Sequence, residues 1–381
     1  MMKSNFMDTL LDGVEIVWKR LGEVTTIKTG QSVSKQLIST NPGKYPVINS
    51  GREPLGFINK WNTDNDPIGI TTRGAGVGSI TWVEGKYFRG NLNYSVTINS
   101  NQKINVRYLY HLLLEMQADI KALCTFVGIP ALNAGNLKEL KIPIPCPNNP
   151  EKSLEIQAEI VRILDTFTEL TAELTAELTA ELTARKKQYT YYREQLLTFE
   201  EGQVEWKTLG EVCSIGVGQS PNDTGIGEYP FVNAGTTPSG YLSDFNTEPD
   251  TITTPSRGQG GIGFVGYQNS HFWCGPLCYR IRSTCKSIKT RFIYYVMSNS
   301  MANIIGLANM AGVPALNRKE LILFKIPIPC LTEQERIVSI LDKFDALTTS
   351  ITEGLPREIE LRQKQYEYYR NMLLSFPKEE V

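Results

Sequence analysis

The sequence has 381 residues, and its 39 lysines and arginines nearly balance its 40 aspartates and glutamates, for a formal net charge of −1. A hydrophobic fraction of 41% excludes a disordered chain, and the length predicts about two to three domains that each bury a core. No apolar run approaches the roughly 18 residues that a membrane-spanning helix needs, and seven scattered cysteines indicate reduced thiols rather than a disulfide framework. We therefore expect a cytoplasmic protein, and the near-zero charge disfavours a nucleic-acid partner unless the charges are segregated.

An internal repeat organises the chain, because segments of the first half return in the second half in the same order. The repeated pairs are Trp18–Val24 with Trp206–Val212, Tyr45–Gly51 with Tyr229–Gly235, Gly128–Asn133 with Gly312–Asn317, Lys141–Cys146 with Lys325–Cys330, Ile160–Asp165 with Ile337–Asp342, and Lys187–Arg193 with Lys364–Arg370. The repeating unit is too long for a solenoid, so the chain is two copies of one module. Two copies predict an internal pseudo-two-fold arrangement.

The first part of each module is predicted to be a β-rich globular domain. It is rich in Gly, Asn, Thr and aromatic residues, and short β-like runs such as Ser95–Ile98 alternate with turn signals. We expect one helix over Val106–Leu123 and its counterpart over Thr290–Met301. With the long helices described next, these features indicate the α+β class.

The second part of each module is predicted to be a long helix. It lacks β signals, and residues 160–199 align without a gap on residues 337–376. About forty residues of helix extend about 60 Å, which is too long to serve one small domain. Gly354 and Pro356 predict a kink near residues 352–356, because a proline inside a helix removes a hydrogen bond and clashes with the preceding turn.

An apolar stripe predicts that the two long helices pair with each other. The first carries Thr-Ala-Glu-Leu three times from Thr171 to Leu182, flanked by the spacing of three and four residues that is typical of coiled coils. The second carries a degenerate version of this stripe. We expect an antiparallel coiled coil, and the alternative is an amphipathic helix packed on its own domain. The candidate residues for helix pairing or partner docking are Leu170, Leu174, Leu178, Leu182, Tyr189, Tyr192, Ile351, Leu355, Tyr366 and Tyr369.

No catalytic centre is recognisable in the sequence. His111 and His271 are the only histidines, and the cysteines lack the spacing of a zinc site, so we predict neither a metal nor a catalytic residue. Residues 258–263 fit the Gly-x-Gly-x-x-Gly pattern of nucleotide-binding loops, but the corresponding loop at residues 73–78 does not. Aromatic or β-branched residues follow both loops, with no evident helix, which favours tight β-turns.

The charges are segregated between the two parts of each module. Residues 14–150 carry 15 basic and 9 acidic side chains (+6), and residues 204–330 carry 10 and 8 (+2). The helical residues 151–199 carry 6 and 9, and residues 331–381 carry 7 and 10, so each is at −3. Basic domains with exposed arginine and amide groups are suited to phosphate and base contacts, although turn or surface chemistry is the better explanation for any single one of these residues. The candidate DNA-binding residues are Asn49, Arg52, Lys60, Arg73, Arg89, Asn91, Asn93, Asn233, Arg257 and Gln259.

In combination these features resemble the specificity subunit of type I restriction-modification enzymes. The resemblance rests on two divergent β-rich domains closed by Lys-Ile-Pro-Ile-Pro-Cys, on long helices ending in Lys-Gln-Tyr-x-Tyr-Tyr-Arg, and on the Thr-Ala-Glu-Leu repeats. It covers essentially the whole chain and implies a non-catalytic subunit with target-recognition domains at residues 1–150 and 201–331. Residues 151–200, with the repeats at 171–182, and residues 332–381 are then two long antiparallel spacer helices.

The same resemblance implies partners. Each domain would read half of a bipartite double-stranded DNA target in the major groove, while the helices would set the spacer and dock two methyltransferase subunits, which restriction (translocase) subunits then join. S-adenosylmethionine, ATP and Mg²⁺ would bind those partners, with no cofactor in this chain. Two other function classes remain open: a coiled-coil scaffold without DNA binding, and a stand-alone nucleotide-dependent methyltransferase suggested by residues 258–263.

Overall fold

A computed structural model describes the chain apart from residues 1–9, 12, 52, 201, 222–224, 350–353 and 377–381. The chain divides into two compact units. Unit 1 comprises the described residues within Met1–Thr175 and Leu361–Val381, and unit 2 those within Ala176–Glu360. Each unit therefore combines one β-rich body with parts of the long helices.

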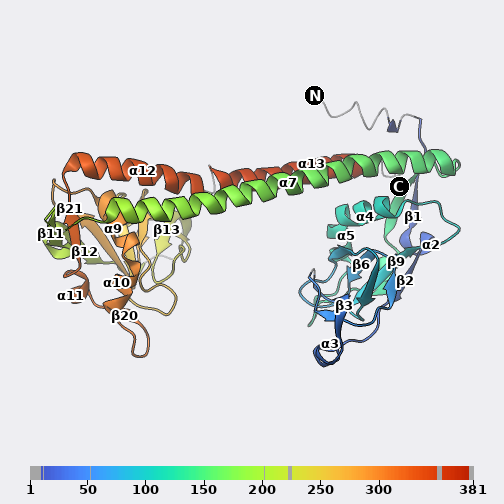
Figure 1. The fold of residues 1–381 in the computed structure, drawn as a ribbon, viewed down its shortest axis with the longest axis horizontal. Coiled ribbons are helices and arrows are strands. Elements are labelled where there is room, and N and C mark those ends of the chain that lie inside the picture. Colours follow the sequence, from blue (N-terminus) through green and yellow to red (C-terminus); the bar gives the residue numbers. More distant parts are fainter. Residues whose placement is uncertain are drawn as a thin grey trace. The chain divides into compact units, whose positions relative to one another are not determined.

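Unit 1 builds its β-rich body from ten strands (Figure 1). They are β1 Ile16–Arg20, β2 Thr25–Thr29, β3 Pro42–Ile48, β4 Phe57–Ile58, β5 Thr63–Asp64, β6 Ile68–Thr71, β7 Ile80–Trp82, β8 Lys86–Arg89, β9 Asn93–Ile98 and β10 Lys141–Pro145. One antiparallel sheet has the order β2-β9-β6-β7, and a second has the order β4-β3-β8-β5 with β3 and β8 parallel. β1 and β10 pair separately, with Trp18 opposite Pro143.

Unit 2 repeats this plan. Its strands are β11 Glu205–Thr208, β12 Cys213–Val217, β13 Ile226–Val232, β14 Tyr241–Leu242, β15 Thr251–Pro255, β16 Gly266–Gln268, β17 Trp273–Cys274, β18 Cys278–Ser283, β19 Ala308–Asn309, β20 Ala315–Leu316 and β21 Lys325–Ile328. The sheet orders are β12-β18-β15-β16 and β14-β13-β17, with β13 and β17 parallel, and β11 pairs with β21 with Trp206 opposite Pro327. The sequence repeat is thus a repeat of strand register.

Shorter helices cover the sheets. They are α2 Leu21–Val24, α3 Lys35–Thr40, α4 Val106–Glu115, α5 Gln117–Ala122 and α6 Ala134–Lys138 in unit 1, and α8 Leu209–Val212, α9 Thr290–Asn299, α10 Met301–Gly306 and α11 Arg318–Leu321 in unit 2. The side chain of Asn105 starts α4 by accepting the backbone N–H groups of Arg107 and Tyr108, at 2.8 and 3.2 Å. The single helix predicted over residues 106–123 is two helices, because the backbone leaves the helical region at Met116 (ψ 15°).

The long helices differ from each other more than the sequence predicts. α7 spans Pro150–Leu197 as one helix of 48 residues, about 72 Å long. The second half of the repeat forms two helices, α12 Leu331–Thr349 and α13 Leu355–Leu374, rather than one kinked helix. Gly354 has φ +81°, which a right-handed helix does not accept. Pro356 then lies in the first turn of α13, where its missing N–H costs no helical bond.

Each hydrophobic core joins a sheet to the long helices. In unit 1, α4 lies between the strands and α7 (Figure 1). Its buried face, Tyr108, Leu109, Leu112 and Leu113, packs in one cluster with Ile156, Ile160 and Leu164 of α7 and Leu373 and Leu374 of α13. In unit 2 the corresponding cluster contains Phe292, Ile293 and Val296 of α9, Ile337 and Leu341 of α12, and Leu197 of α7. The apolar stripes of the long helices are therefore shared between domain packing and helix pairing.

The helices pair inside each unit. In unit 1 the rings of Phe167 and Tyr369 stack at 5.0 Å, and the hydroxyl of Thr168 donates to that of Tyr366 at 3.0 Å, which is the antiparallel direction predicted. In unit 2, Tyr189 and Tyr192 stack on Phe344 of α12, at 6.0 and 5.7 Å.

The remaining residues of the predicted stripe are less uniformly covered. Leu174, Leu178, Leu182 and Leu355 are half-buried, whereas Leu170 is 57% exposed. Ile351 lies outside the described residues. Among the helices that the structure describes, none is long and apolar enough to cross a membrane.

Candidate nucleic-acid interface

Four loops of unit 1 meet at one end of its sheets. They follow β3, β6 and β8 and precede α6, and backbone hydrogen bonds tie them together. Gly90 donates to the carbonyl of Ile48 at 2.7 Å, Thr72 to that of Leu92 at 2.9 Å, and Gly74 to that of Pro130 at 2.9 Å. We call this the loop cluster of domain 1. It brings together three candidates that are distant in the sequence, Asn49, Arg73 and Asn91.

Unit 2 builds the same loop cluster from the second copy of the motifs. Gly275 donates to the carbonyl of Val232 at 2.8 Å, Ser256 to that of Leu277 at 2.8 Å, and Gly258 to that of Pro314 at 3.0 Å. These bonds correspond one by one to those of domain 1. The loop cluster of domain 2 contains the candidates Asn233, Arg257 and Gln259.

Each loop cluster has an exposed arginine at the same position. Arg73 forms a β-bridge with Ala131, and Arg257 forms the equivalent bridge with Ala315, so each backbone is fixed while the side chain is exposed. Among the described residues, no carboxylate pairs with either guanidinium. An exposed guanidinium on a rigid backbone is well placed for bidentate contact with a phosphate or with guanine.

Asn49 and Asn233 shape the loops from within. The Asn49 side chain is 9% exposed and accepts the N–H of Leu92 at 2.9 Å. The Asn233 side chain accepts the N–H of Leu277 at the same distance. The oxygen of each amide therefore binds the backbone of a neighbouring loop, which explains why the asparagine is present in both copies. Their positions support a positioning role rather than direct reading of bases.

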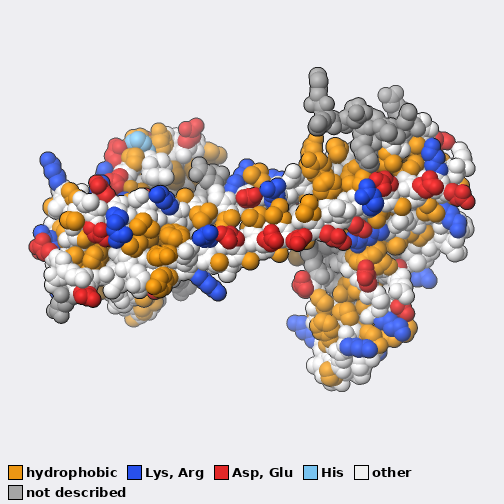
Figure 2. All heavy atoms as spheres, turned by 45° about the horizontal axis from the view of Figure 1, so that its top comes forward, with side chains coloured by type: hydrophobic (Ala, Val, Ile, Leu, Met, Phe, Trp, Pro, Cys, Tyr) orange, Lys and Arg blue, Asp and Glu red, His pale blue; other side chains and the backbone are white. Residues whose placement is uncertain are grey.

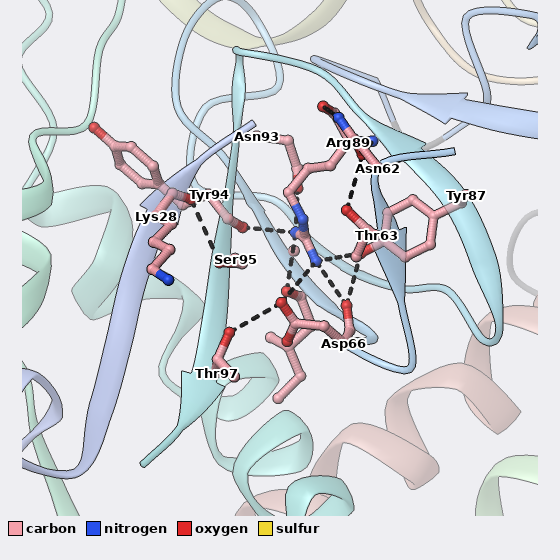
Figure 3. A network of polar contacts seen from close by, with 12 residues as sticks. Lys28, Asn62, Thr63, Asp66, Tyr87, Arg89, Asn93, Tyr94, Ser95 and Thr97 are labelled. Carbon is pink, nitrogen blue, oxygen red and sulfur yellow. Dashed lines mark hydrogen bonds and ion pairs between the residues drawn. The ribbon is translucent and has the colours of Figure 1, made fainter. Parts of the chain in front are cut away.

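Arg89 and Asn93 require a correction, because both lie inside domain 1 (Figure 3). Arg89 is 3% exposed and Asn93 is fully buried. The Arg89 guanidinium donates to Asn93 Oδ1 at 2.7 Å, to the carbonyls of Asp66, Ile68 and Tyr94, and to the hydroxyl of Tyr87, with the Asp66 carboxylate at 3.7 Å. A buried guanidinium cannot contact DNA. These two residues instead hold β6, β8 and β9 together.

Burial also sets the titration of this network. Desolvation raises the pKa of Tyr87 to about 12 and lowers the pKa of Arg89. Tyr87 therefore stays neutral at physiological pH.

The other candidates of domain 1 lie on its surface. Asn91 is exposed in the loop cluster, and Lys60 is exposed between β4 and β5 with its ammonium 5.8 Å from the ring centre of Phe88. Arg52 lies outside the described residues. In domain 2, Gln259 is exposed beside Arg257.

Unit 2 also has a basic cleft that the sequence did not predict. It has a volume of about 470 Å³ and lies on β12 and β18. Its lining includes Arg280, Arg282 and Arg318, and we call it the arginine groove. Arg280 is held there by bonds to the carbonyl of Asn246 and the hydroxyl of Thr247, at 3.0 and 3.2 Å. A strand assignment with period-two alternation would have placed Arg280 and Arg282 on one face.

A second missed feature anchors each domain to its long helix. Arg107 and His111 of α4 contact the same carboxylate oxygen of Asp165 in α7, at 2.9 and 2.8 Å. Arg291 of α9 contacts Asp342 of α12 at 2.8 Å. The signal was present in the sequence, because the Ile-Leu-Asp segment and the arginine both recur.

The helices present the opposite charge. In Figure 2 acidic side chains follow one another along the helical segment. Within α7, Glu159 and Glu181 pair with arginines of the same helix, Arg162 and Arg185, at 2.8 Å. Such exposed pairs are mainly solvated helix surface. The basic loop clusters, and not the helices, are therefore the candidate DNA-binding surfaces.

The comparisons with known proteins identify the family. The type I restriction modification DNA specificity domain matches twice, at residues 14–184 and 202–361. The chain belongs to this family. It is a DNA specificity subunit of a type I restriction-modification system, and its relatives are named as specificity subunits rather than as catalytic ones.

Relatives match this specificity subunit over its whole length. It is 37% identical to the specificity subunit of the type I restriction enzyme EcoR124I/EcoR124II of Escherichia coli, over 100% of this chain and 99% of the relative. It is 34% identical to a putative type I specificity subunit of Haemophilus influenzae, over 98% and 100%.

A solved structure shares the fold. The crystal structure of the S subunit of the type I restriction-modification system from M. genitalium has a TM-score of 0.57 at 22% identity, covering 96% of this chain and 98% of that one.

Proposed function

We propose that this specificity subunit reads a bipartite double-stranded DNA target, with one half-site for each domain. The observation that carries the proposal is the repeated loop cluster. Each copy presents an exposed arginine, Arg73 or Arg257, that no described carboxylate neutralises, on a domain with a net positive charge. Two copies of one DNA-binding module in one chain match a target made of two half-sites.

The long helices complete the proposal. We propose that α7 with α12 and α13 sets the spacing between the half-sites and docks two methyltransferase subunits, with restriction subunits joining that complex. S-adenosylmethionine, ATP and Mg²⁺ would bind the partner subunits. The complex would act in the cytoplasm, which the seven free cysteines of the chain support.

The role of the loop clusters is tested by the Arg73→Ala variant, expressed with the methyltransferase subunits in cells whose adenine methylation is then mapped. We expect discrimination at the first half-site to fall by about 1–3 kcal/mol, the value of a good bidentate base contact, while the second half-site stays unchanged. Arg257→Ala is the matched variant and should affect the second half-site alone. Equal losses at both half-sites in either variant would contradict the assignment.

The role of α7 is tested by deleting Thr179–Leu182, one Thr-Ala-Glu-Leu repeat. Four residues contribute about 6 Å of helix, against about 3.4 Å for each base pair. We therefore expect the methylated target to lose about one or two base pairs of its non-specific spacer while both half-sites keep their sequence. A changed half-site with an unchanged spacer would refute the role proposed for the helix.

A further inference from the structure

Each loop cluster carries an exposed apolar hairpin tip. In domain 1 the tip is residues 126–130, closed by two hydrogen bonds between Thr125 and Ala131, at 2.9 and 3.0 Å. In domain 2 it is residues 310–314, closed by the pairing of β19 with β20. We call them the apolar tips. Neither belongs to the residues discussed above as candidates for DNA contact.

The apolar tips expose side chains that proteins normally bury. Phe126 is 63% exposed, Val127 97% and Ile129 62%, while Met310 and Val313 are each 58% exposed. Single exposed apolar residues need no explanation, but a cluster at the end of a rigid hairpin indicates a contact surface. Exposure of these apolar groups to water is unfavourable, yet both domains have it. We therefore infer that both tips make the same kind of contact.

The conformation of the tips is retained along with their apolar character. Gly128 and Gly312 occupy the same place in the two tips, with φ +79° and +76°. Other residues adopt this region only with strain, which explains why glycine recurs there. Retained shape and retained apolarity, in domains that have diverged in their interior and on their surface, indicate one shared task.

A cation lies beside each tip. The backbone of Arg73 bridges to Ala131, at the base of the first hairpin, and Gly74 donates to the carbonyl of Pro130 within the tip, at 2.9 Å. Arg257 bridges to Ala315, and Gly258 donates to the carbonyl of Pro314 at 3.0 Å. Each apolar tip and its exposed guanidinium are therefore held as one rigid unit.

We propose that the two apolar tips are wedges that enter the DNA, one at each half-site, and unstack a base step next to the base that the neighbouring arginine contacts. This inference rests on the proposed function. Proteins that kink DNA insert side chains of the kind exposed here, such as phenylalanine, isoleucine and methionine. The adjacent guanidinium gives each tip a positive charge that is attracted to the DNA.

The difference between the tips favours DNA over a protein partner. The first tip presents Phe-Val-Gly-Ile and the second Met-Ala-Gly-Val. Two identical copies of a partner subunit would offer the same pocket twice, and such a pocket favours the same side chain in both domains. A base step accepts apolar side chains of several shapes. Substitution of Phe by Met and of Val by Ala is compatible with the second kind of site.

The experiment uses the full chain assembled with its methyltransferase subunits and duplexes that carry the mapped target. 2-Aminopurine, whose fluorescence rises when it is unstacked, replaces one base at a time in each half-site. The adenine that is methylated is left unchanged. We expect the unmodified complex to give a rise at one step in each half-site. Phe126→Ala should abolish the first rise alone, with an affinity loss of about tenfold, typical of one aromatic base-stacking contact. Met310→Ala should abolish the second rise alone.

Leu323→Ala is the matched control, since Leu323 is 61% exposed and apolar but lies outside the tip of domain 2. It should change neither signal. If the double variant Phe126→Ala/Met310→Ala keeps both fluorescence rises, the wedges are disproved although DNA recognition stands. If that variant no longer copurifies with the methyltransferase subunits, the tips dock protein, and the inference is overturned. A complex of the unmodified chain that retains no duplex would overturn the proposed function itself.

Discussion

The two recognition domains share a strand plan but differ in what fills one interior position. In domain 1, Arg89 and Asn93 form the centre of a buried polar network, whereas the strand register places Cys274 and Cys278 at the same points of domain 2. Both cysteines are fully buried beside Val232 and Phe272. Domain 1 therefore fills this interior position with a charged network, and domain 2 fills it with a small apolar cluster.

The asparagine side chains that hold the backbone at this position are the same in both domains. Asn62 accepts the N–H of Arg89 and donates to its carbonyl, at 2.6 and 2.9 Å, and Asn246 does the same with Cys274, at 2.7 and 3.0 Å. These bonds go to the backbone, so they do not depend on the side chain at the clamped position. The comparison shows that backbone-directed asparagines keep the frame while the interior chemistry varies.

The largest expected effect of this difference is on stability. Arg89→Ala leaves Asn93 Oδ1, the Asp66 carboxylate and three carbonyls without their buried donor, and we expect a loss of about 3–5 kcal/mol of unfolding free energy. Cys274→Ala, the matched change in domain 2, should cost about 1 kcal/mol. Urea unfolding, with hydrogen exchange assigning each transition to its domain, measures both. Similar losses in the two variants would remove the distinction.

A smaller effect is expected from the arginine groove of domain 2. Arg280 and Arg282 pair with Gly216 and Ser214 of the neighbouring strand, where domain 1 has Ser95 and Thr97 opposite Lys28 and Thr26.

If Arg282 binds a DNA phosphate, Arg282→Ala makes the negative slope of log affinity against log salt less steep by about 0.9 for duplexes containing the second half-site. Lys286→Ala, an exposed cation outside the groove, is the control. An unchanged slope for Arg282→Ala would assign the groove to another purpose.

The smallest effect concerns pH, and it sharpens the comparison of the two helix anchors. His111 is 1% exposed, and burial lowers its pKa, although its bond to Asp165 acts in the opposite sense. The unfolded chain therefore takes up a proton near pH 6.5 that the folded domain resists, so stability is present above that pH and is lost as the pH falls. Tyr295, which occupies this place beside Asp342, has its pKa raised by burial and does not titrate in this range.

Urea midpoints at pH 7.5 and pH 5.5 measure this effect. The unmodified chain should lose more stability in domain 1 between these two values than the His111→Tyr variant, in which the histidine is replaced by the residue that domain 2 uses. Domain 2 provides the internal reference in both proteins. An equal loss in the two proteins would show that His111 does not contribute.

Much of the architecture could be predicted because the repeat, the charge segregation and the helical stripe are local patterns. Regular apolar spacing and uninterrupted helix formers specify α7, and the recurrence of whole segments specifies two similar domains. The second long helix was less predictable. Gly354 adopts a left-handed backbone between α12 and α13, and a proline two residues later is compatible with either a kink or a helix start.

The sequence by itself determined that this chain has two related basic domains, an acidic helical part and no recognisable catalytic motif. Only the tertiary structure decided which polar residues face water. Arg73 and Arg89 are both arginines in glycine-rich surroundings, yet one is exposed and the other is bonded to β6 and β9, strands formed by other parts of the sequence. Burial depends on strand pairing between distant residues, and that pairing also places each apolar tip beside its arginine.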